Sequence, residues 1–124
     1  MDEKYLYNED AYQLIGLMYD VYNVLGFGHR EKVYQNAFAE ELDRNKIKYL
    51  REFYIPVHYK GKIISRYFFD FIIDNKIIVE LKIGNEMLES YVKQILAYLK
   101  SSHIKLALLF VITPKEVKVK RIIH

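Results

Sequence analysis

Residues 70–84 read DFIIDNKIIVELKIG, and this stretch decides the interpretation of the whole chain. Two apolar runs rich in isoleucine flank the sequence Asp-Asn-Lys at 74–76, a pattern typical of two strands joined by a turn. The same stretch carries three ionisable side chains, those of Asp70, Glu80 and Lys82. Burying an unpaired charge on a strand destabilises a fold by several kcal/mol, so the three side chains need a common explanation.

Strand geometry relates the three ionisable residues to one another. Glu80 and Lys82 are two positions apart, so their side chains leave the same face of the strand with Cα atoms about 6.6 Å apart. If residues 74–76 form a three-residue loop, Asp70 lies opposite Glu80, with Cβ atoms roughly 5 Å apart. A two-residue loop would instead turn Asp70 to the other face, and hairpin preferences allow both loops.

Two carboxylates that lie close together repel each other, and one of them has a raised pKa unless a cation lies between them. Lys82 could neutralise part of this charge in a buried Asp–Lys–Glu ion-pair cluster. A hard divalent cation would neutralise more, because Mg²⁺ binds one or two carboxylates together with water. With all three residues on one sheet face, we favour a metal site over the ion-pair cluster.

Two further polar residues lie near apolar helix faces. Glu31 is one turn before Tyr34 on the second helix, although an acid in a first helical turn is also explained by the helix dipole. Gln94 is one turn before Tyr98 on the third helix, where a boundary glutamine is the simpler interpretation. Glu31 strengthens the metal interpretation because it leans towards the apolar face of its helix, whereas Gln94 taken alone is a boundary residue.

The remaining sequence predicts an α/β domain that spans residues 1–124, with elements in the order ααβββαββ. Strands that are apolar on both faces predict a mixed sheet, centred on the hairpin of residues 63–83 and flanked by helices on both faces. Asn85 is the expected N-cap of the third helix. The helices are expected at 9–25, 29–45 and 86–100, and the strands at 49–59, 63–73, 77–83, 105–112 and 116–123.

Composition narrows the class of protein. The 124 residues contain no cysteine, which excludes disulfides, zinc bound by cysteine and thiol catalysis. This usage fits a reducing compartment, and we expect a cytoplasmic location. The polar N-terminus does not resemble a signal peptide, and the apolar run 106–112 is too short to span a membrane, so no membrane partner is expected. The formal net charge of +3 permits a polyanionic partner without requiring one.

Three motifs follow one another in the chain: GHREKVY at 28–34, which reads Gly-x-x-Glu-x-x-Tyr, then DFIIDNKIIVELK at 70–82, then QILAY at 94–98. In this order they resemble the GxxExxY proteins of the PD-(D/E)xK nuclease superfamily, in which an acid on one strand precedes Glu-x-Lys on the next. The proline that commonly precedes the first acid is replaced by Phe69. The resemblance extends over nearly the whole chain.

The resemblance implies a PD-(D/E)xK nuclease-like core and a Mg²⁺-dependent nuclease that hydrolyses phosphodiester bonds in DNA or RNA, with DNA as the first expectation and Mn²⁺ as a possible substitute metal. It assigns a role to each candidate residue. Asp70, Glu80 and the Leu81 backbone carbonyl become metal ligands, Lys82 the catalytic lysine, Glu31 a helix-borne acid that acts directly or through water, and Gln94 an accessory active-site residue.

Two other functions remain open at the level of sequence. A catalytically silent nucleic-acid-binding module could have the same fold, although such a module would be expected to have lost a member of the set Asp70, Glu80 and Lys82. A protein-interaction domain could form a homodimer through the edge strand EVKVKRII at 116–123, whose lysines would otherwise keep that edge soluble. Salt-sensitive binding of DNA or RNA separates the nuclease and the silent binding module from the protein-interaction domain.

Overall fold

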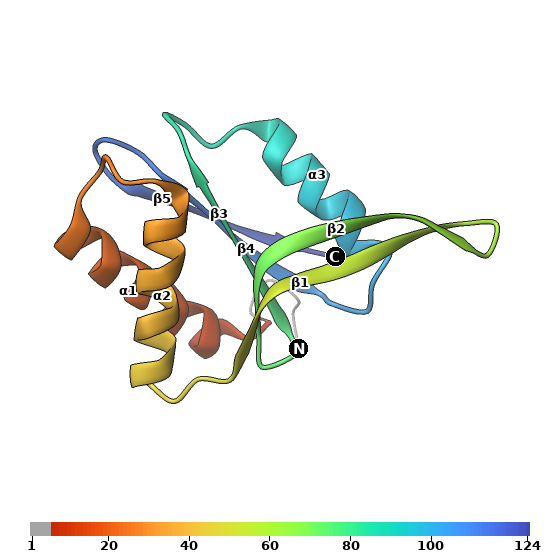
Figure 1. Ribbon diagram of the computed structural model, residues 1–124, viewed down its shortest axis with the longest axis horizontal. Coiled ribbons are helices and arrows are strands. Elements are labelled where there is room, and N and C mark those ends of the chain that lie inside the picture. The colour runs from red at the N-terminus through yellow and green to blue at the C-terminus, as the bar shows by residue number, and fades with distance from the viewer. Residues whose placement is uncertain (1–5) are drawn as a thin grey trace.

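The computed structural model describes residues 6–124, and it confirms the expected α/β fold and element order ααβββαββ (Figure 1). The helix and strand boundaries agree with the expected ones to within a few residues. The elements are α1 (Asn8–Leu25), α2 (Glu31–Arg44), β1 (Tyr49–Tyr59), β2 (Lys62–Ile73), β3 (Ile77–Ile83), α3 (Glu89–Leu99), β4 (Leu106–Ile112) and β5 (Val117–Ile123).

The five strands form one mixed sheet in the order β1-β2-β3-β4-β5. β3 and β4 are parallel, and every other neighbouring pair is antiparallel. A parallel pair needs a crossover connection, and α3 provides it. The hairpin that was expected at the centre of the sheet is therefore confirmed, because β3 is the middle strand.

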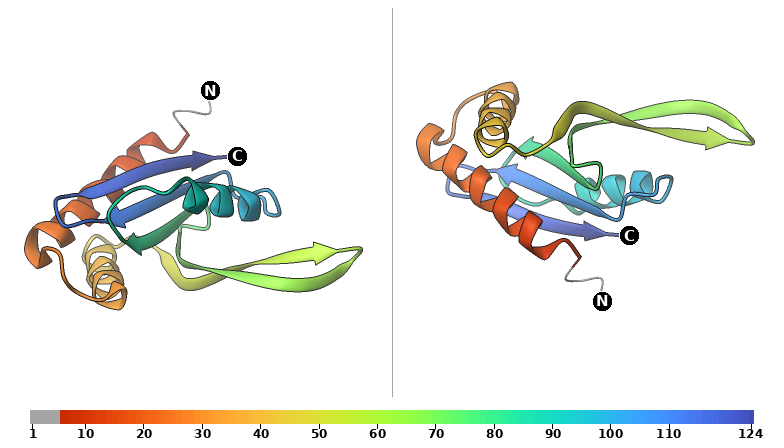
Figure 2. Two further views of the ribbon diagram at one scale, coloured as in Figure 1. Left: turned by 90° about the horizontal axis from the view of Figure 1, so that it is seen from above. Right: turned by 90° about the horizontal axis from the view of Figure 1, so that it is seen from below.

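Helices cover both faces of the sheet, as the two-sided apolar strands predicted (Figure 2). Along β3 and β4, alternate side chains belong to two separate cores. Val79 and Leu108 pack with α1 and α2, whereas Ile78 and Leu109 pack with α3. Within residues 6–124, no helix combines the length and the apolar character needed to cross a membrane.

β1 and β2 continue well beyond β3 and form a two-stranded arm, residues 53–69, that projects from the body of the molecule (Figures 1 and 2). β1 pairs with β2 as far as Tyr59 opposite Lys62. β2 pairs with β3 only over residues 71–73. Among residues 6–124, the arm therefore has no third strand beside it.

A kink separates the arm from the sheet. Glu52 interrupts β1 with a φ of 55°, and it lies between the pairs Arg51–Phe71 and Phe53–Phe69. Phe71 packs on the side of α1 and α2, yet Phe69, two positions away, packs on the side of α3. The strands therefore exchange faces at Glu52 and Asp70. A left-handed conformation at a non-glycine residue costs about 1–2 kcal/mol, which the surrounding pairing must offset.

The expected start of two helices was wrong by a few residues. α3 begins at Glu89 with Leu88 as its N-cap, not at residue 86 with Asn85 as the cap. The Gly84 N–H still donates to the Ile112 carbonyl, so pairing with β4 continues past β3 and the chain needs further residues to reach the face on which α3 packs. α2 begins at Glu31 rather than at 29, because the chain is still extended at its N-cap, Arg30.

Candidate metal centre

The turn between β2 and β3 determines which side chains meet. Residues 74–76 form a three-residue loop, in which Asp74 and Asn75 have φ values of 50° and 58°. Ile73 therefore pairs with Ile77, and the last pair of the ladder is Phe71 with Val79. One step further, Asp70 faces Glu80, as the three-residue loop predicted, and the two-residue alternative is excluded.

Beyond this last pair, the two carboxylates replace the missing ladder bonds. The Asp70 N–H donates to Glu80 Oε1 at 3.0 Å. The Leu81 N–H donates to Asp70 Oδ2 at 2.8 Å. Each acid thus satisfies a backbone donor on or beside the other, which holds the two carboxylates next to each other where the strands diverge.

The other oxygen of each acid also accepts a hydrogen bond. Gln35 Nε2 donates to Asp70 Oδ1 at 2.9 Å, and the Tyr67 hydroxyl lies 3.0 Å from Glu80 Oε2. A carboxylate oxygen has two lone pairs, so all four oxygens can accept one hydrogen bond and still bind a cation. Neither acid forms an ion pair with a lysine, arginine or histidine of residues 6–124.

Glu80 is an unfavourable place for a negative charge in the absence of a cation. Its side chain is only 4% exposed. Burial, and next the neighbouring Asp70 carboxylate, raise the pKa of Glu80 from 4.5 to about 8. Without a cation the pair therefore retains a proton at neutral pH, and a divalent cation would displace that proton.

Lys82 borders the pair without neutralising it. Its Nζ lies over the Tyr91 ring, 5.3 Å from the centroid, and makes no ion pair within the described residues. The buried Asp–Lys–Glu ion-pair cluster, the alternative interpretation, is therefore not formed in this structure. The positive charge of Lys82 instead partly offsets the rise in the pKa of Glu31 that burial, and next Asp70, cause.

Glu31 reaches the site through Gln35. Gln35 Nε2 lies 3.2 Å from Glu31 Oε1 and 2.9 Å from Asp70 Oδ1, so the amide bridges the two acids. Burial, and next Asp70, raise the pKa of Glu31, against the opposing effects of Lys82 and Gln35. No three Asp, Glu or His side chains between residues 6 and 124 are arranged to hold a metal. Asp70 and Glu80 are thus the two adjacent carboxylates that could hold a divalent cation, and such a pair is chemically compatible with Mg²⁺ when water completes the coordination.

The Gly-x-x-Glu-x-x-Tyr motif positions α2. Gly28 has a φ of 122°, which side chains rarely tolerate, and it allows the turn that leads into the helix. Tyr34 is buried, and its hydroxyl donates to the Gly26 carbonyl at 2.6 Å. Glycine and tyrosine thus fix the loop and the first turn of the helix, which place Glu31 and Gln35 beside the sheet.

The Gln-x-x-x-Tyr motif of α3 serves the same site from the other face. Gln94 and Tyr98 are one turn apart, and both contact Tyr67: Gln94 Oε1 lies 3.3 Å from its hydroxyl, and the Tyr98 ring stacks on it with centroids 4.2 Å apart. Burial, and next Glu80, raise the pKa of Tyr67, so its hydroxyl stays protonated as a donor.

Sequence reasoning missed Gln35 and Tyr67 as site residues. The spacing of Gln35, four positions after Glu31 on one helix, was an available signal. Tyr67 gave no signal, because it is three positions before Asp70 and a regular strand would turn it to the opposite face. The exchange of faces at Glu52 and Asp70 brings Tyr67 to Glu80.

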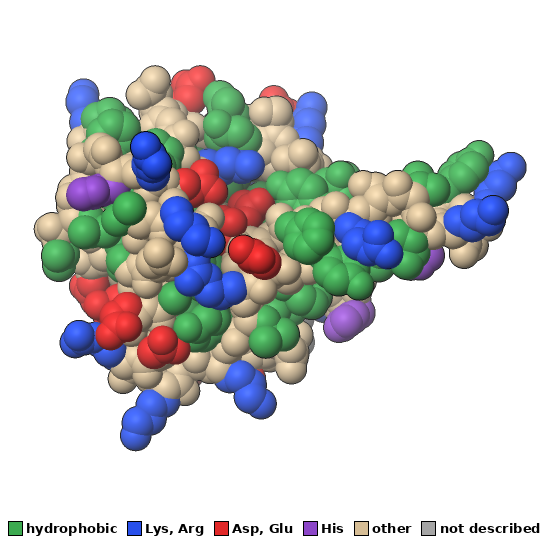
Figure 3. Space-filling model, viewed as in Figure 1, with side chains coloured by type: hydrophobic (Ala, Val, Ile, Leu, Met, Phe, Trp, Pro, Cys, Tyr) green, Lys and Arg blue, Asp and Glu red, His purple; other side chains and the backbone are tan. Residues whose placement is uncertain are grey.

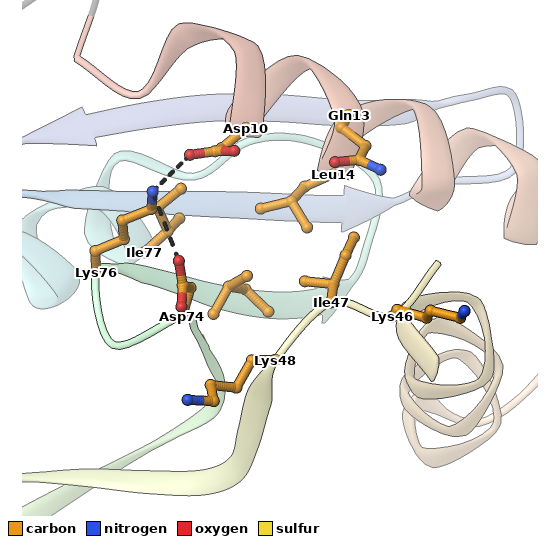
Figure 4. Close-up of a pocket in the computed structure, with 10 residues that line it drawn as sticks. Asp10, Gln13, Leu14, Lys46, Ile47, Lys48, Asp74, Lys76 and Ile77 are labelled. Atoms are coloured by element: carbon orange, nitrogen blue, oxygen red, sulfur yellow. Dashed lines mark ion pairs between the residues drawn. The ribbon is translucent and has the colours of Figure 1, made fainter. Parts of the chain in front are cut away.

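The Asp70–Glu80 pair differs from the cavity beside α1 in its surroundings. Acidic side chains gather between α2 and the arm, and basic side chains surround them (Figure 3). A cavity of about 310 Å³ lies between α1 and the 74–76 turn (Figure 4). Of the three lysines that line it, Lys76 already pairs with Asp10 at 2.7 Å and with Asp74 at 3.7 Å. The Asp70–Glu80 pair does not line this cavity.

Comparison with known proteins identifies the class. The family model of the PD-(D/E)XK nuclease superfamily matches residues 8–122, and the chain belongs to this superfamily. The crystal structure of SSO0001 is similar, with a TM-score of 0.60 and 21% sequence identity over 95% of this chain. The matched region is 59% of the SSO0001 chain, and at this identity the likeness concerns the fold alone. The comparison with curated proteins gave no significant match.

Proposed function

We propose that the protein is a Mg²⁺-dependent nuclease that hydrolyses phosphodiester bonds. The observation that carries the proposal is the pair of adjacent carboxylates, Asp70 and Glu80, which has no ion-paired cation within residues 6–124. An acid pair of this kind, with one buried and one half-buried member, is a common feature of sites that hold a cation or a proton for chemistry. Membership of a nuclease superfamily makes the cation the better explanation.

Each residue has a role in this proposal. Asp70, Glu80 and the Leu81 carbonyl hold the cation, which when bound polarises a phosphate oxygen and lowers the pKa of a water molecule. Lys82, on the same strand as Glu80, orients the attacking water and offsets the negative charge that develops on the phosphate. Tyr67 and Gln94 fix the orientation of Glu80, and Gln35 fixes that of Asp70. Glu31 acts through Gln35 or through water.

Several finer assignments belong to the same proposal. We assign the chain to the GxxExxY group because Gly28, Glu31 and Tyr34 occur at the expected spacing. DNA is the preferred substrate and RNA the alternative, with Mn²⁺ able to replace Mg²⁺. The chain acts as one domain in the cytoplasm. A homodimer through the edge strand β5 remains the alternative to an edge that its lysines keep unpaired.

A cleavage assay tests the function. Purified protein is incubated with single- and double-stranded DNA and RNA, with Mg²⁺, Mn²⁺ or EDTA. We expect cleavage that requires a divalent cation and is lost in Lys82→Ala and in Lys82→Arg, since a planar guanidinium does not replace an ammonium at a point position. Both variants should stay folded and bind nucleic acid.

Two results would contradict the proposed nuclease function. One is the absence of cleavage by the wild type with every cation and substrate. The other is cleavage that persists unchanged in EDTA, because the proposed reaction requires a bound divalent cation. Salt-sensitive binding without cleavage would instead favour the silent binding module.

A further inference from the structure

The arm presents one covered face and one open face. Ile55 and Phe69 on its inner face are buried against the core around α3. On the outer face, the side chains of Tyr54 and Phe68 are 45% and 57% exposed. Single exposed apolar side chains are ordinary, but two large aromatic rings side by side on a projecting hairpin form an apolar patch of the kind found at binding surfaces.

The open face carries an ordered strip rather than scattered side chains. Tyr54 pairs with Phe68 across the hairpin, with ring centroids 5.5 Å apart. Pro56 pairs with Arg66, and the Arg66 guanidinium lies 5.7 Å from the centroid of the Tyr54 ring. We call these four residues the outer strip. A groove of about 480 Å³ runs beside it along β1, lined by residues that include Tyr54 and Pro56.

The charge of the arm indicates what this strip contacts. Residues 53–69 contain Lys60, Lys62 and Arg66 and no aspartate or glutamate. A cationic surface with exposed aromatic rings is complementary to a polyanion whose flat groups can stack on the rings. Lysines also discourage the arm from pairing edge to edge with a second copy of the chain.

The open rings favour unpaired bases over a duplex. In a duplex, each base is stacked between its neighbours and only the backbone and groove edges are accessible. In a single strand, the base faces are free to stack on tyrosine or phenylalanine. Phe68 is two residues before Asp70 on β2, so the outer strip and the carboxylate pair are neighbours along this strand.

We propose that the outer strip binds single-stranded nucleic acid, with bases stacked on Tyr54 and Phe68 and phosphates on Arg66, and presents the strand to the Asp70–Glu80 pair. Presentation for cleavage rests on the nuclease function proposed above, whereas binding does not. The substrate class is therefore single-stranded or unpaired regions of nucleic acid.

Fluorescence anisotropy with a labelled oligothymidine strand and its oligoadenosine duplex, both in EDTA, tests this inference. The variant Tyr54→Ala with Phe68→Ala should bind the single strand at least about tenfold more weakly, since each stacked base contributes roughly a factor of ten. Duplex binding should change less than about twofold. A matched control, Tyr12→Ala with Tyr19→Ala, removes two exposed rings from α1 and should leave both affinities unchanged.

A second variant, Tyr54→Leu with Phe68→Leu, keeps apolar side chains on the strip and is expected to retain the melting temperature while still losing single-strand affinity. The inference is overturned if the aromatic variants lose no more affinity than the α1 control, or if duplex binding falls equally. It is also overturned if sedimentation shows a wild-type dimer that the strip variants dissociate. Selective loss of single-strand binding without any wild-type cleavage would keep this inference and refute the nuclease.

Discussion

The two halves of β2 differ in what surrounds them, although their residues are of the same kinds. Phe71 has strands on both sides and is fully buried, with the Phe38 ring 5.3 Å away. Phe68, three positions earlier, has one partner strand and is 57% exposed. Residue type alone therefore does not determine burial here. The surroundings do: Phe71 lies between two strands in the core around α1 and α2, whereas Phe68 lies on the open face of the arm, opposite the face on which Phe69 is buried.

Asp70 marks the boundary between the two halves. At this point the ladder ends, and carboxylates take over the backbone donors that a third strand would have satisfied. A buried unsatisfied N–H costs about 1–3 kcal/mol, so this capping is structurally useful. The same capping brings two acids together, which is structurally unfavourable without a cation. The same two carboxylates thus satisfy backbone N–H groups and form a pair that could bind a cation.

The largest expected effect compares the two phenylalanines. Phe71→Ala should lower the free energy of unfolding by about 3–5 kcal/mol, because it leaves a cavity among rings in a closed core. Phe68→Ala, the matched change on the arm, should lower it by at most about 1 kcal/mol. Chemical denaturation followed by circular dichroism measures both. Equal losses would contradict the division of β2 into a closed and an open half.

A second prediction concerns the pH dependence of stability without metal. The pKa of Glu80 is about 8 in the folded protein and near 4.5 when unfolded, so only the unfolded state ionises between these values. The free energy of unfolding should therefore fall as pH rises from about 4.5 to 8, by a few kcal/mol, since a tenfold change in proton affinity corresponds to about 1.4 kcal/mol.

The control for this prediction is Glu80→Gln, which does not titrate and should lack this loss. Denaturation curves for both proteins in EDTA across that range make the comparison. Addition of Mg²⁺ should offset the loss in the wild type at the upper end of the range. If the free energy of unfolding of the two proteins changes in parallel with pH, the pKa of Glu80 is not raised in the folded protein.

The smallest effect tests the kink. Glu52→Gly should raise the free energy of unfolding by up to about 1 kcal/mol, because glycine adopts the φ of 55° without strain. The ion pair that this change removes, Lys32 with Glu52 at 3.8 Å, is exposed and contributes little. The control Ser65→Gly, at an exposed position of the arm that lacks a positive φ, should be destabilising by about 0.5–1 kcal/mol. Thermal melts compare the two, and the same sign for both would mean that Glu52 is not strained.

Much of the fold could be predicted from local sequence signals. Asp-Asn-Lys between two isoleucine-rich runs predicted the hairpin, and the apolar faces of both strands predicted helices on both sides. The same hairpin placed Asp70 opposite Glu80 once a three-residue loop was assumed. These features depend on residues close in sequence, so local sequence patterns are enough to predict them.

What could not be predicted depends on contacts between distant segments. The length of the arm depends on where β3 stops pairing, and no residue type marks that point. The approach of Tyr67 to Glu80 depends on a left-handed Glu52, whereas the sequence there favours a regular strand. The late start of α3 depends on pairing of Gly84 with β4. In each case tertiary pairing overrides the local pattern.

The most direct measurement is the binding of Mg²⁺ or Mn²⁺ by isothermal titration calorimetry. Wild-type protein should bind the cation and release protons, because Glu80 must ionise to act as a ligand. Asp70→Asn should bind more weakly, and Asp70→Asn with Glu80→Gln should show no binding while unfolding no more easily than the metal-free wild type at neutral pH. If the double variant binds the cation as tightly as the wild type, the Asp70–Glu80 pair is not the metal centre.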